Sequence, residues 1–348
     1  MTILYIDMDY FYAACEELRH PDYKGKPFAV GSADEANKLK GVIQTSNYAA
    51  RKYGIKSGMP AAMAFKLYPN LIYAKADEDY YEGISKKLMD ILKSYGFKMQ
   101  QNSIDEAALD LKEMPYEDAE KLGKEIKERI EKELMLPSTV GISFGPVFAK
   151  MACDAAKPDG LLAVDERNIM EFLKGKPIES IPGIGPRARE RLEALGIKTI
   201  DELGKANVQT LKDSLGIFGE ELYLLAEGVD RSKVEEDTKT LSISREKTLE
   251  KAATSFDELK DIINEMSRQV SEDARAKGLL FKSVGIKIRY EDFTQITRNA
   301  GLSHYSSSWQ EVYEIAEKLC NANLSGKGIS KIGVRISSFM EGSKQKRL

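Results

Sequence analysis

The chain has 348 residues, which exceeds the usual size of one domain and favours two to four domains. Its formal net charge is −3, so the whole chain lacks the positive excess that is typical of nucleic-acid-binding proteins. The charge is uneven, however, because residues 241–348 carry 18 Lys and Arg against 14 Asp and Glu. Nucleic-acid binding is therefore compatible with the last third of the chain.

Cysteine usage and hydropathy limit the cellular setting. The three cysteines, Cys15, Cys153 and Cys320, are far apart, show no metal-binding spacing and follow no signal peptide, which indicates reduced thiols. No apolar run approaches the length of a membrane span. We expect a cytoplasmic monomer that does not associate with membranes.

The first half of the chain shows a βαββαβ pattern. Apolar periodicity predicts strands over 2–7, 97–103, 106–111 and 138–144, and helices over 78–95 and 117–135. This order predicts a ferredoxin-like sheet in which residues 11–76 are inserted after the first strand. In such a sheet the first strand and the 97–111 hairpin can be neighbours.

Residues 166–229 predict short helices. Residues 181–186 read Ile-Pro-Gly-Ile-Gly-Pro, and a helix over 187–195 follows, which resembles a helix-hairpin-helix motif. Its glycines, Gly183 and Gly185, would allow a tight turn that presents backbone N–H groups to a DNA phosphate. Residues 229–240 are almost all polar and predict a linker.

The last third repeats the α+β pattern. Strands are predicted over 241–250, 282–291, 295–300 and 329–339, and helices over 255–279 and 308–322. Strand alternation puts four basic side chains on one sheet face: Lys287, Arg289, Lys331 and Arg335. This face could lie along phosphates, and the alternative is an ordinary half-solvated sheet face.

Three acidic residues dominate the sequence: Asp7 at the end of the first strand, and the adjacent Asp105 and Glu106 in the hairpin. If the two strands are neighbours, the three carboxylates converge, and they cannot all stay ionised without cations. Oxygen ligands with no nearby His or Cys favour Mg²⁺. Two such ions about 3.5–4 Å apart are a recurring device for phosphoryl transfer. The alternative is that Asp105 and Glu106 are solvated turn residues.

Three motifs carry a resemblance to a known family. They are Asp7-Met8-Asp9-Tyr10-Phe11-Tyr12, Thr45-Ser46-Asn47-Tyr48-Ala49-Ala50-Arg51 and Ser103-Ile104-Asp105-Glu106-Ala107. In this order they resemble the Y-family translesion DNA polymerases of the DinB type, and the archaeal members most closely. The resemblance covers nearly the whole chain.

The resemblance implies an α+β multidomain fold. It comprises a palm (1–10 and 77–165), inserted fingers (11–76), an all-α helix-hairpin-helix thumb (166–228), a linker (229–240), an α+β little finger (241–340) and a tail (341–348). The implied activity is template-directed, low-fidelity DNA synthesis on primer-template DNA from deoxynucleoside triphosphates, without proofreading and with two Mg²⁺ ions.

The resemblance also assigns roles to residues. Asp7, Asp105 and Glu106 would be catalytic and, with the Met8 carbonyl, would hold the metal ions. The incoming nucleotide would contact Tyr10, Phe11, Tyr12, Thr45, Tyr48, Arg51 and Lys157, with Tyr12 as the steric gate against ribose. Gly183, Gly185 and the four basic residues of the last sheet would bind DNA.

The sequence departs from the family pattern at Ala108, where a tyrosine is usual, at Pro146, which cannot supply a charge or an N–H, and at Gln44, where a small residue is expected. The ending Gln345-Lys346-Arg347-Leu348 resembles the front half of a sliding-clamp peptide whose paired aromatic residues would follow in a longer chain. Two other functions remain open: a nucleotide cyclase, which also uses paired carboxylates on such a sheet, and a non-catalytic DNA-binding repair scaffold.

Overall fold

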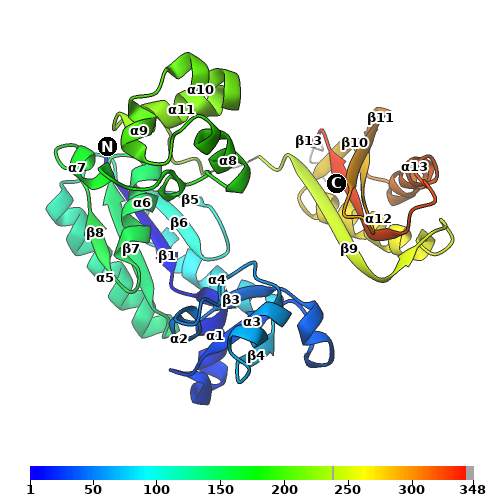
Figure 1. Ribbon diagram of the computed structural model, residues 1–348, viewed down its shortest axis with the longest axis horizontal. Helices are drawn as coiled ribbons and strands as arrows, with labels where there is room; N and C mark the ends of the chain where they lie inside the picture. Colours follow the sequence, from blue (N-terminus) through cyan, green and yellow to red (C-terminus); the bar gives the residue numbers. More distant parts are fainter. Residues whose placement is uncertain (237–238, 342–348) are drawn as a thin grey trace, which may run out of the picture. The chain divides into compact units, whose positions relative to one another are not determined.

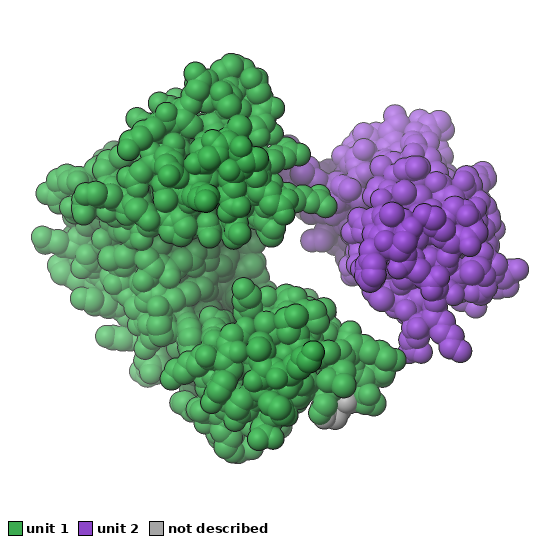
Figure 2. Space-filling model, viewed as in Figure 1, with its two compact units in different colours: residues 1–237 green, residues 238–348 purple. Residues whose placement is uncertain are grey.

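The computed structural model describes residues 1–236 and 239–341, so the predicted clamp peptide at 345–348 lies outside the described residues. The chain divides into two compact units, Met1–Asp237 (unit 1) and Thr238–Leu348 (unit 2), shown in Figure 2. Among the described helices, none has both the length and the hydropathy that a membrane crossing requires.

Unit 1 is built on a five-stranded central sheet with the strand order β5-β6-β1-β7-β8. Its strands are β1 (Ile3–Met8), β5 (Lys98–Gln101), β6 (Glu106–Asp110), β7 (Ser138–Ser143) and β8 (Leu161–Ala163). Helices α4 (Glu78–Lys93) and α5 (Tyr116–Leu134) pack on one face, and α6 (Pro146–Ala156) packs on the other (Figure 1). The predicted βαββαβ order is confirmed.

Strand β1 is buried on both faces because its apolar residues alternate between two cores. Leu4 and Ile6 are fully buried in the core that α4 and α5 share, whereas Ile3 and Tyr5 belong to the smaller core under α6. Antiparallel pairing of β1 with β6 and β7 makes β1 the middle strand. The acidic residue at its end, Asp7, therefore lies on the α6 face with Ile3 and Tyr5.

Helix α6 can lie close to the sheet because of a glycine on β7. A Cβ atom at Gly141 would overlap the carbonyl oxygen of Ala149 and the backbone nitrogen of Cys153, both in α6. Pro146 is the first residue of α6, a position where the missing N–H costs no helical hydrogen bond. The unusual Pro146 thus has a local structural role.

The inserted segment between β1 and α4 contains a three-stranded sheet with the order β3-β2-β4. Its elements are α1 (Phe11–Arg19), η1 (Pro21–Tyr23), β2 (Phe28–Gly31), η2 (Glu35–Lys40), β3 (Ile43–Ser46), α2 (Tyr48–Arg51), α3 (Ala61–Leu67) and β4 (Ile72–Lys75). Asn47 joins them: its Oδ1 accepts the N–H groups of Ala50 and Phe28, at 3.0 and 3.2 Å, and its Nδ2 donates to Glu17 at 2.8 Å. This buried amide fixes α2 against β2 and α1.

Residues 166–229 fold into short helices, as predicted. They are α7 (Ile169–Leu173), η3 (Ile178–Ser180), α8 (Pro186–Ala194), α9 (Ile200–Gly204), α10 (Val208–Leu215) and α11 (Ile217–Ala226). Gly183 adopts φ +95°, a conformation that L side chains rarely adopt, so the turn before α8 requires a glycine there.

The first part of the predicted linker is docked on the central sheet. The Asp230 carboxylate accepts the Val147 N–H at 2.8 Å, at the first turn of α6. Val234 is only 2% exposed and packs in the same small core as Tyr5 and Ala108. Ala108, the residue that replaces the usual tyrosine, therefore contributes to the space that Val234 fills. The sequence did not indicate this docking.

Unit 2 is a second sheet with the order β11-β10-β12-β9, in which β13 also pairs with β10. Its elements are β9 (Ser242–Ala253), α12 (Lys260–Ala276), β10 (Leu279–Tyr290), β11 (Gln295–Ser306), α13 (Trp309–Asn321), β12 (Ile329–Ser337) and β13 (Met340–Glu341). Ile286, Ile288, Ile332 and Val334 are buried with α12 and α13, which confirms the predicted strand alternation.

Several boundaries in unit 2 differ from the prediction, and the start of α12 and the end of β11 differ most. Helix α12 begins at Lys260 and not at 255, because the Glu258 side chain accepts the Thr254 N–H at 3.2 Å and the Ser255 hydroxyl at 2.9 Å and so closes a turn. Strand β11 continues to Ser306 because it pairs with β10 over most of its length. The pattern of apolar residues along the sequence does not indicate that pairing with β10.

Candidate active site

The three acidic residues meet at one end of the central sheet. Asp7 on β1 lies directly opposite Glu106 on β6 in the antiparallel register. The N–H of Met8 donates to the Asp105 carbonyl at 3.1 Å, which fixes Asp105 beside the end of β1. Asp7 is only 3% exposed. Strand pairing thus gathers residues that are about a hundred positions apart in the chain.

Two lysines balance these carboxylates. Lys150 of α6 places its Nζ 2.6 Å from an Asp7 oxygen and 2.5 Å from a Glu106 oxygen. Lys157, just beyond α6, places its Nζ 2.6 Å from the other Asp7 oxygen. Both lysines also approach Asp154, at 3.1 and 3.6 Å. Within residues 1–236 and 239–341, no three His, Cys, Asp or Glu side chains are gathered closely enough to hold a metal ion.

Hydrogen bonds hold the acidic side chains in place. The Tyr5 hydroxyl donates to Glu106 at 3.0 Å and accepts from the Asn102 amide at 3.0 Å. The Ser103 hydroxyl donates to Asp105 at 2.6 Å. Because these partners lie on the same strands or the adjoining turn, the carboxylate positions are determined by the sheet itself.

The electrostatic environment shifts the pKa values of the three acids in different directions: it lowers that of Asp7 and raises those of Asp105 and Glu106. Burial raises the pKa of Asp105, and the nearby Asp7 charge raises it further. Burial and the hydrogen bond with Asp7 likewise raise the pKa of Glu106. Burial opposes ionisation of Asp7, but the Glu106 hydrogen bond and the Lys150 and Lys157 charges outweigh it and lower its pKa. Asp7 is therefore the acid that the site holds ionised most strongly.

Asp9 organises the neighbouring residues. One of its oxygens accepts the hydroxyls of Tyr48, at 3.2 Å, and Thr139, at 2.9 Å, and the other accepts the Asp159 N–H at 2.7 Å. The Arg51 guanidinium lies 4.9 Å from the Tyr48 ring centroid, so the predicted proximity of this pair on α2 is confirmed. Tyr48 is thus tied to the acidic end of the central sheet.

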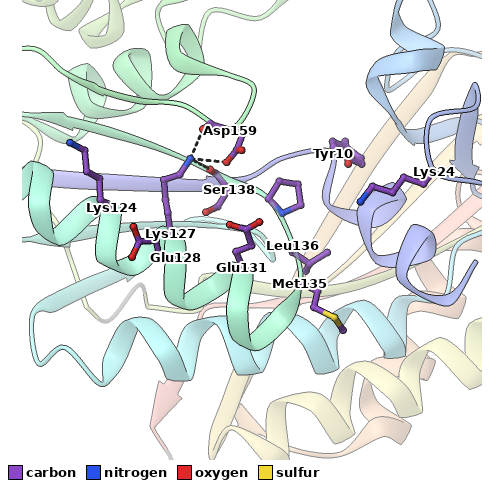
Figure 3. A pocket seen from close by; sticks show the side chains of 11 residues that line it. Tyr10, Lys24, Lys124, Lys127, Glu128, Glu131, Met135, Leu136, Ser138 and Asp159 are labelled. Atoms are coloured by element: carbon purple, nitrogen blue, oxygen red, sulfur yellow. Dashed lines mark hydrogen bonds and ion pairs between the residues drawn. The ribbon is translucent and has the colours of Figure 1, made fainter. Parts of the chain in front are cut away.

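The Asp159 loop is held from the α5 side. Lys127 donates to the Ser138 carbonyl at 2.7 Å and to the Asp159 carboxylate at 2.8 Å (Figure 3). These residues line a pocket of about 390 Å³ together with Tyr10 and Lys24. The pocket contains none of the three acids, although Tyr10, one of the predicted nucleotide contacts, lines it.

The start of α1 has an unusual backbone. Tyr10 is its N-cap residue in a left-handed conformation, with φ 41° and ψ 45°, and Phe11 is the first helical residue. The Tyr12 ring stacks on the fully buried Tyr81 ring, with centroids 4.4 Å apart and planes 16° apart. Tyr81 in turn donates its hydroxyl to Glu16 at 2.8 Å, so the Tyr12 ring rests on a fixed support.

Strand β3 carries Thr45, a predicted nucleotide contact, and Gln44, one of the departures from the family pattern. Thr45 is half-buried, three residues before Tyr48. Gln44 lines a broad cavity with Ser32 and Ala76, and its buried Oε1 has no hydrogen-bond partner among the described residues. The departure at Gln44 therefore puts an amide group where a small residue was expected.

The predicted DNA-binding residues form two separate groups. Gly183 and Gly185 are exposed before α8, and the Gly185 N–H already donates to the Gly183 carbonyl at 3.1 Å. On the open face of unit 2, Lys287 and Lys331 both pair with Glu246, at 2.8 and 2.5 Å.

The remaining two basic residues of that face are less constrained. Arg335 is exposed, and Arg289 donates to the Ser330 hydroxyl at 3.4 Å. Glu246, an acid that the sequence reasoning did not assign to this face, therefore pairs with two of its four bases and offsets one of its four positive charges.

Sequence reasoning did not assign Lys150 to the site, and it gave Lys157 only as a nucleotide contact and not as a partner of Asp7. Lys150 and Lys157 are seven positions apart, two helical turns, and this spacing could have indicated a shared face. Asp9 follows Asp7 in the same motif, yet its partners Thr139 and Asp159 come from distant segments, and no local signal indicates them.

Models of known families match three parts of the chain. A model of the impB/mucB/samB family matches residues 6–154, and its C-terminal domain matches residues 240–348. A model described as the DNA polymerase-iota thumb domain matches residues 179–230. Together these matches cover most of the sequence.

Curated relatives and solved structures agree with these matches. DNA polymerase IV of Methanoculleus marisnigri is 35% identical over 341 residues, which span 98% of this chain and 94% of that protein. DNA polymerase IV of Clostridium perfringens is 35% identical over 342 residues, which span 97% and 94%.

Among solved structures, a Y-family DNA polymerase chimera, Dbh-Dpo4(243-245)-Dbh, is similar with a TM-score of 0.90 and 28% identity over 98% of this chain and 99% of that chain. The crystal structure of DinB from Sulfolobus solfataricus is similar with a TM-score of 0.67 and 27% identity over 98% and 100%. The chain belongs to the Y-family DNA polymerases, and within them to the DinB type, DNA polymerase IV. It is a DNA-directed DNA polymerase of the translesion class.

Proposed function

We propose that the chain adds deoxynucleotides to a primer 3′-hydroxyl at the end of the central sheet, with Asp7, Asp105 and Glu106 as the catalytic residues. The observation that carries this proposal is the convergence of these acids on paired strands beside Lys150. One similar solved structure is an insertion ternary complex of Dbh DNA polymerase. By analogy, the substrates here are primer-template DNA and a deoxynucleoside triphosphate.

The acids are suited to divalent cations. The donor set contains only oxygens, which favours Mg²⁺, and the Lys150 ammonium already bonds to oxygens of both Asp7 and Glu106, so a cation fits between them. Asp7, Asp105, Glu106 and the Met8 carbonyl would hold two Mg²⁺ ions. Such ions make the primer hydroxyl more acidic and neutralise charge on the leaving phosphate.

The nucleotide would lie between the acids and the inserted segment. The backbone N–H groups of Tyr10, Phe11 and Tyr12 at the start of α1 suit a triphosphate, because a helix N-terminus favours anions. The side chains of Thr45, Tyr48, Arg51 and Lys157 would add hydrogen bonds and positive charge. Asp9 would orient the Tyr48 hydroxyl for this contact.

Tyr12 would exclude ribonucleotides. Its ring is backed by Tyr81 and cannot retreat without breaking a stacked pair. A 2′-hydroxyl placed against that ring would clash, which is discrimination by repulsion.

Primer-template DNA would contact the Gly183–Gly185 turn and the open face of unit 2 through Lys287, Arg289, Lys331 and Arg335. With these roles, residues 1–10 and 77–165 form the palm, 11–76 the fingers, 166–228 the thumb, 229–240 the linker and 241–340 the little finger. Binding to a sliding clamp through 345–348 stays a prediction, because those residues lie outside the described part.

Primer extension with the intact protein tests this function. With Mg²⁺ and all four deoxynucleotides, we expect template-dependent extension of a primed strand, no product on an unprimed strand, and none in EDTA. A cyclase would instead convert ATP alone to a cyclic product. A non-catalytic scaffold would bind the primed DNA without extending it, and either result would overturn the proposal.

A further inference from the structure

Lys150 bonds to three carboxylates of unequal burial. Its Nζ lies 2.6 Å from Asp7, 2.5 Å from Glu106 and 3.1 Å from Asp154. The side chains of Asp7 and Glu106 are 4% and 23% exposed, whereas that of Asp154 is 45% exposed. An ammonium has three N–H donors, so each carboxylate can receive one. Lys150 therefore connects the buried acids to an acid at the rim.

The backbone makes this arrangement possible. Gly141 lets α6 approach the central sheet, which brings Lys150 over the end of β1. Lys150 and Asp154 are four residues apart on α6, so they share one helix face. Lys157 holds the second Asp7 oxygen and also approaches Asp154, at 3.6 Å. Asp154 thus faces both lysines.

Buried carboxylates require a compensating cation, because an unpaired charge in the interior is very costly. The oxygens of Asp7 and Glu106 that bond to Lys150 are the same groups that would bind divalent cations. An ammonium and a divalent cation cannot both occupy the space between them. The lysine side chain is long and has four rotatable bonds, so it can exchange one acceptor for another.

We propose that Lys150 is an exchangeable internal counter-ion: it bonds to Asp7 and Glu106 in the cation-free protein, and when a divalent cation enters it leaves these two acids and keeps only its outer partner, Asp154. This inference rests on the proposed binding of divalent cations by these acids. Lys150 is a positioning residue here, since it acts on the cation through the carboxylates.

Two single variants change cation affinity in opposite directions. Lys150→Gln removes the competing charge, so Mn²⁺ should bind more tightly, by about tenfold, which corresponds to about 1.4 kcal/mol. Asp154→Asn removes the acceptor at the rim, so the displaced lysine loses its alternative partner and Mn²⁺ should bind more weakly. The affinities are measured by titration calorimetry of the whole protein with MnCl₂ alone, without DNA or nucleotide.

Thermal unfolding provides a second readout that does not depend on turnover. In EDTA, Lys150→Gln should unfold at a lower temperature than the wild type, because two buried carboxylates have lost a partner. Added Mn²⁺ should raise the unfolding temperature of this variant more than that of the wild type, because binding to the folded state stabilises it by mass action.

Lys127→Gln is a matched control. The Lys127 side chain is 16% exposed, close to the 17% of Lys150, and it donates to backbone carbonyls and Asp159 on the α5 side (Figure 3). Its ammonium bonds to these groups and not to Asp7 or Glu106, so its removal should leave Mn²⁺ affinity within about twofold of the wild type.

The double variant separates the exchange from general electrostatics. If Asp154 acts by receiving Lys150, then Asp154→Asn should have little effect once Lys150 is glutamine. If Asp154 only contributes long-range negative charge, Asp154→Asn should weaken Mn²⁺ binding equally with Lys150 present and with Lys150→Gln. That result would show that the proposed exchange of Lys150 between acids is wrong.

Unchanged Mn²⁺ affinity and an unchanged unfolding shift in Lys150→Gln would also overturn the inference. So would the absence of Mn²⁺ binding in every variant. In that case primer extension by the wild type shows which proposal fails: an active enzyme refutes only the counter-ion exchange, whereas an enzyme inactive with every divalent cation refutes the proposed function as well.

Discussion

Two helices pack on one face of each sheet: α4 and α5 on the central sheet of unit 1, and α12 and α13 on the sheet of unit 2. The opposite face of each sheet carries charged side chains. In the central sheet the charges are buried acids, and lysines from α6 and its end neutralise them. In unit 2 they are bases, of which three are half-buried and Arg335 is exposed, and Glu246 of β9 pairs with two of the four.

The difference reflects the cost of burial. Asp7 is 3% exposed, and an unpaired charge there would destabilise the fold strongly, so its two oxygens each have an ammonium partner. Arg335 is exposed and needs no partner, because water solvates it. Unit 1 thus pairs its buried charges within the protein, while unit 2 leaves a basic side chain exposed to solvent, as the proposed contact with DNA phosphates requires.

The largest effect is expected in the central sheet. Asp105→Ala should lower primer extension by about three orders of magnitude or more, because it removes transition-state stabilisation at the reacting phosphate. DNA affinity should hardly change. The matched control is Asp110→Ala, at the far end of β6, the strand that begins directly after Asp105, and on the face of Glu106. Extension by Asp105→Ala within tenfold of wild type would contradict its catalytic role.

The second-largest effect is expected on sugar discrimination, for which the Tyr12 ring is held in place by Tyr81. Tyr12→Ala should raise kcat/KM for ribonucleotides relative to deoxynucleotides by about a hundredfold, because it removes a clash. Tyr12→Phe keeps the ring and should keep the discrimination. The ratio comes from single-nucleotide insertion kinetics, and an unchanged ratio in Tyr12→Ala would show that Tyr12 only packs on Tyr81.

A pair of glycines compares the two sheets directly. In Gly141→Ala the new methyl meets backbone atoms of α6, which cannot move without shifting the helix, so unfolding free energy should fall by about 1–3 kcal/mol. In Gly333→Ala the nearest atoms are Cγ of Glu246 at 2.8 Å and the Arg245 carbonyl oxygen at 3.1 Å, both farther away than the backbone atoms that Gly141→Ala meets, so the loss should be smaller. Urea unfolding of both variants measures the difference; equal losses would show that the two faces are equally rigid.

The smallest effect is expected on the face of unit 2. Glu246→Gln frees Lys287 and Lys331, so primer-template DNA should bind about threefold to tenfold more tightly, with a steeper dependence of affinity on salt, because more counterions are released. Glu314→Gln on α13, on the helical side of the sheet, makes the same charge change and serves as control. If the two variants behave alike, Glu246 has no special relation to DNA.

The sequence by itself determined the elements and the chemical character of the site. Alternation along 282–291 and 329–339 predicted which side chains of β10 and β12 are buried, because a strand turns successive side chains to opposite faces. Asp7 with Asp105 and Glu106 indicated the acidic cluster, since the βαββαβ order makes their strands neighbours. The alternation of buried side chains and the order of the strands follow from short-range backbone geometry, so the sequence of neighbouring residues is enough to predict them.

Only the tertiary structure decided how the charges are paired. Glu246 reaches Lys287 and Lys331 because β9 pairs with β12 in a register that puts Glu246 opposite Gly333. Lys150 reaches Asp7 because α6 packs closely on β7. Val234 packs against the central sheet because the small side chain of Ala108 leaves space in the core beneath α6. Register and helix packing arise from contacts between distant segments, and no local periodicity specifies them.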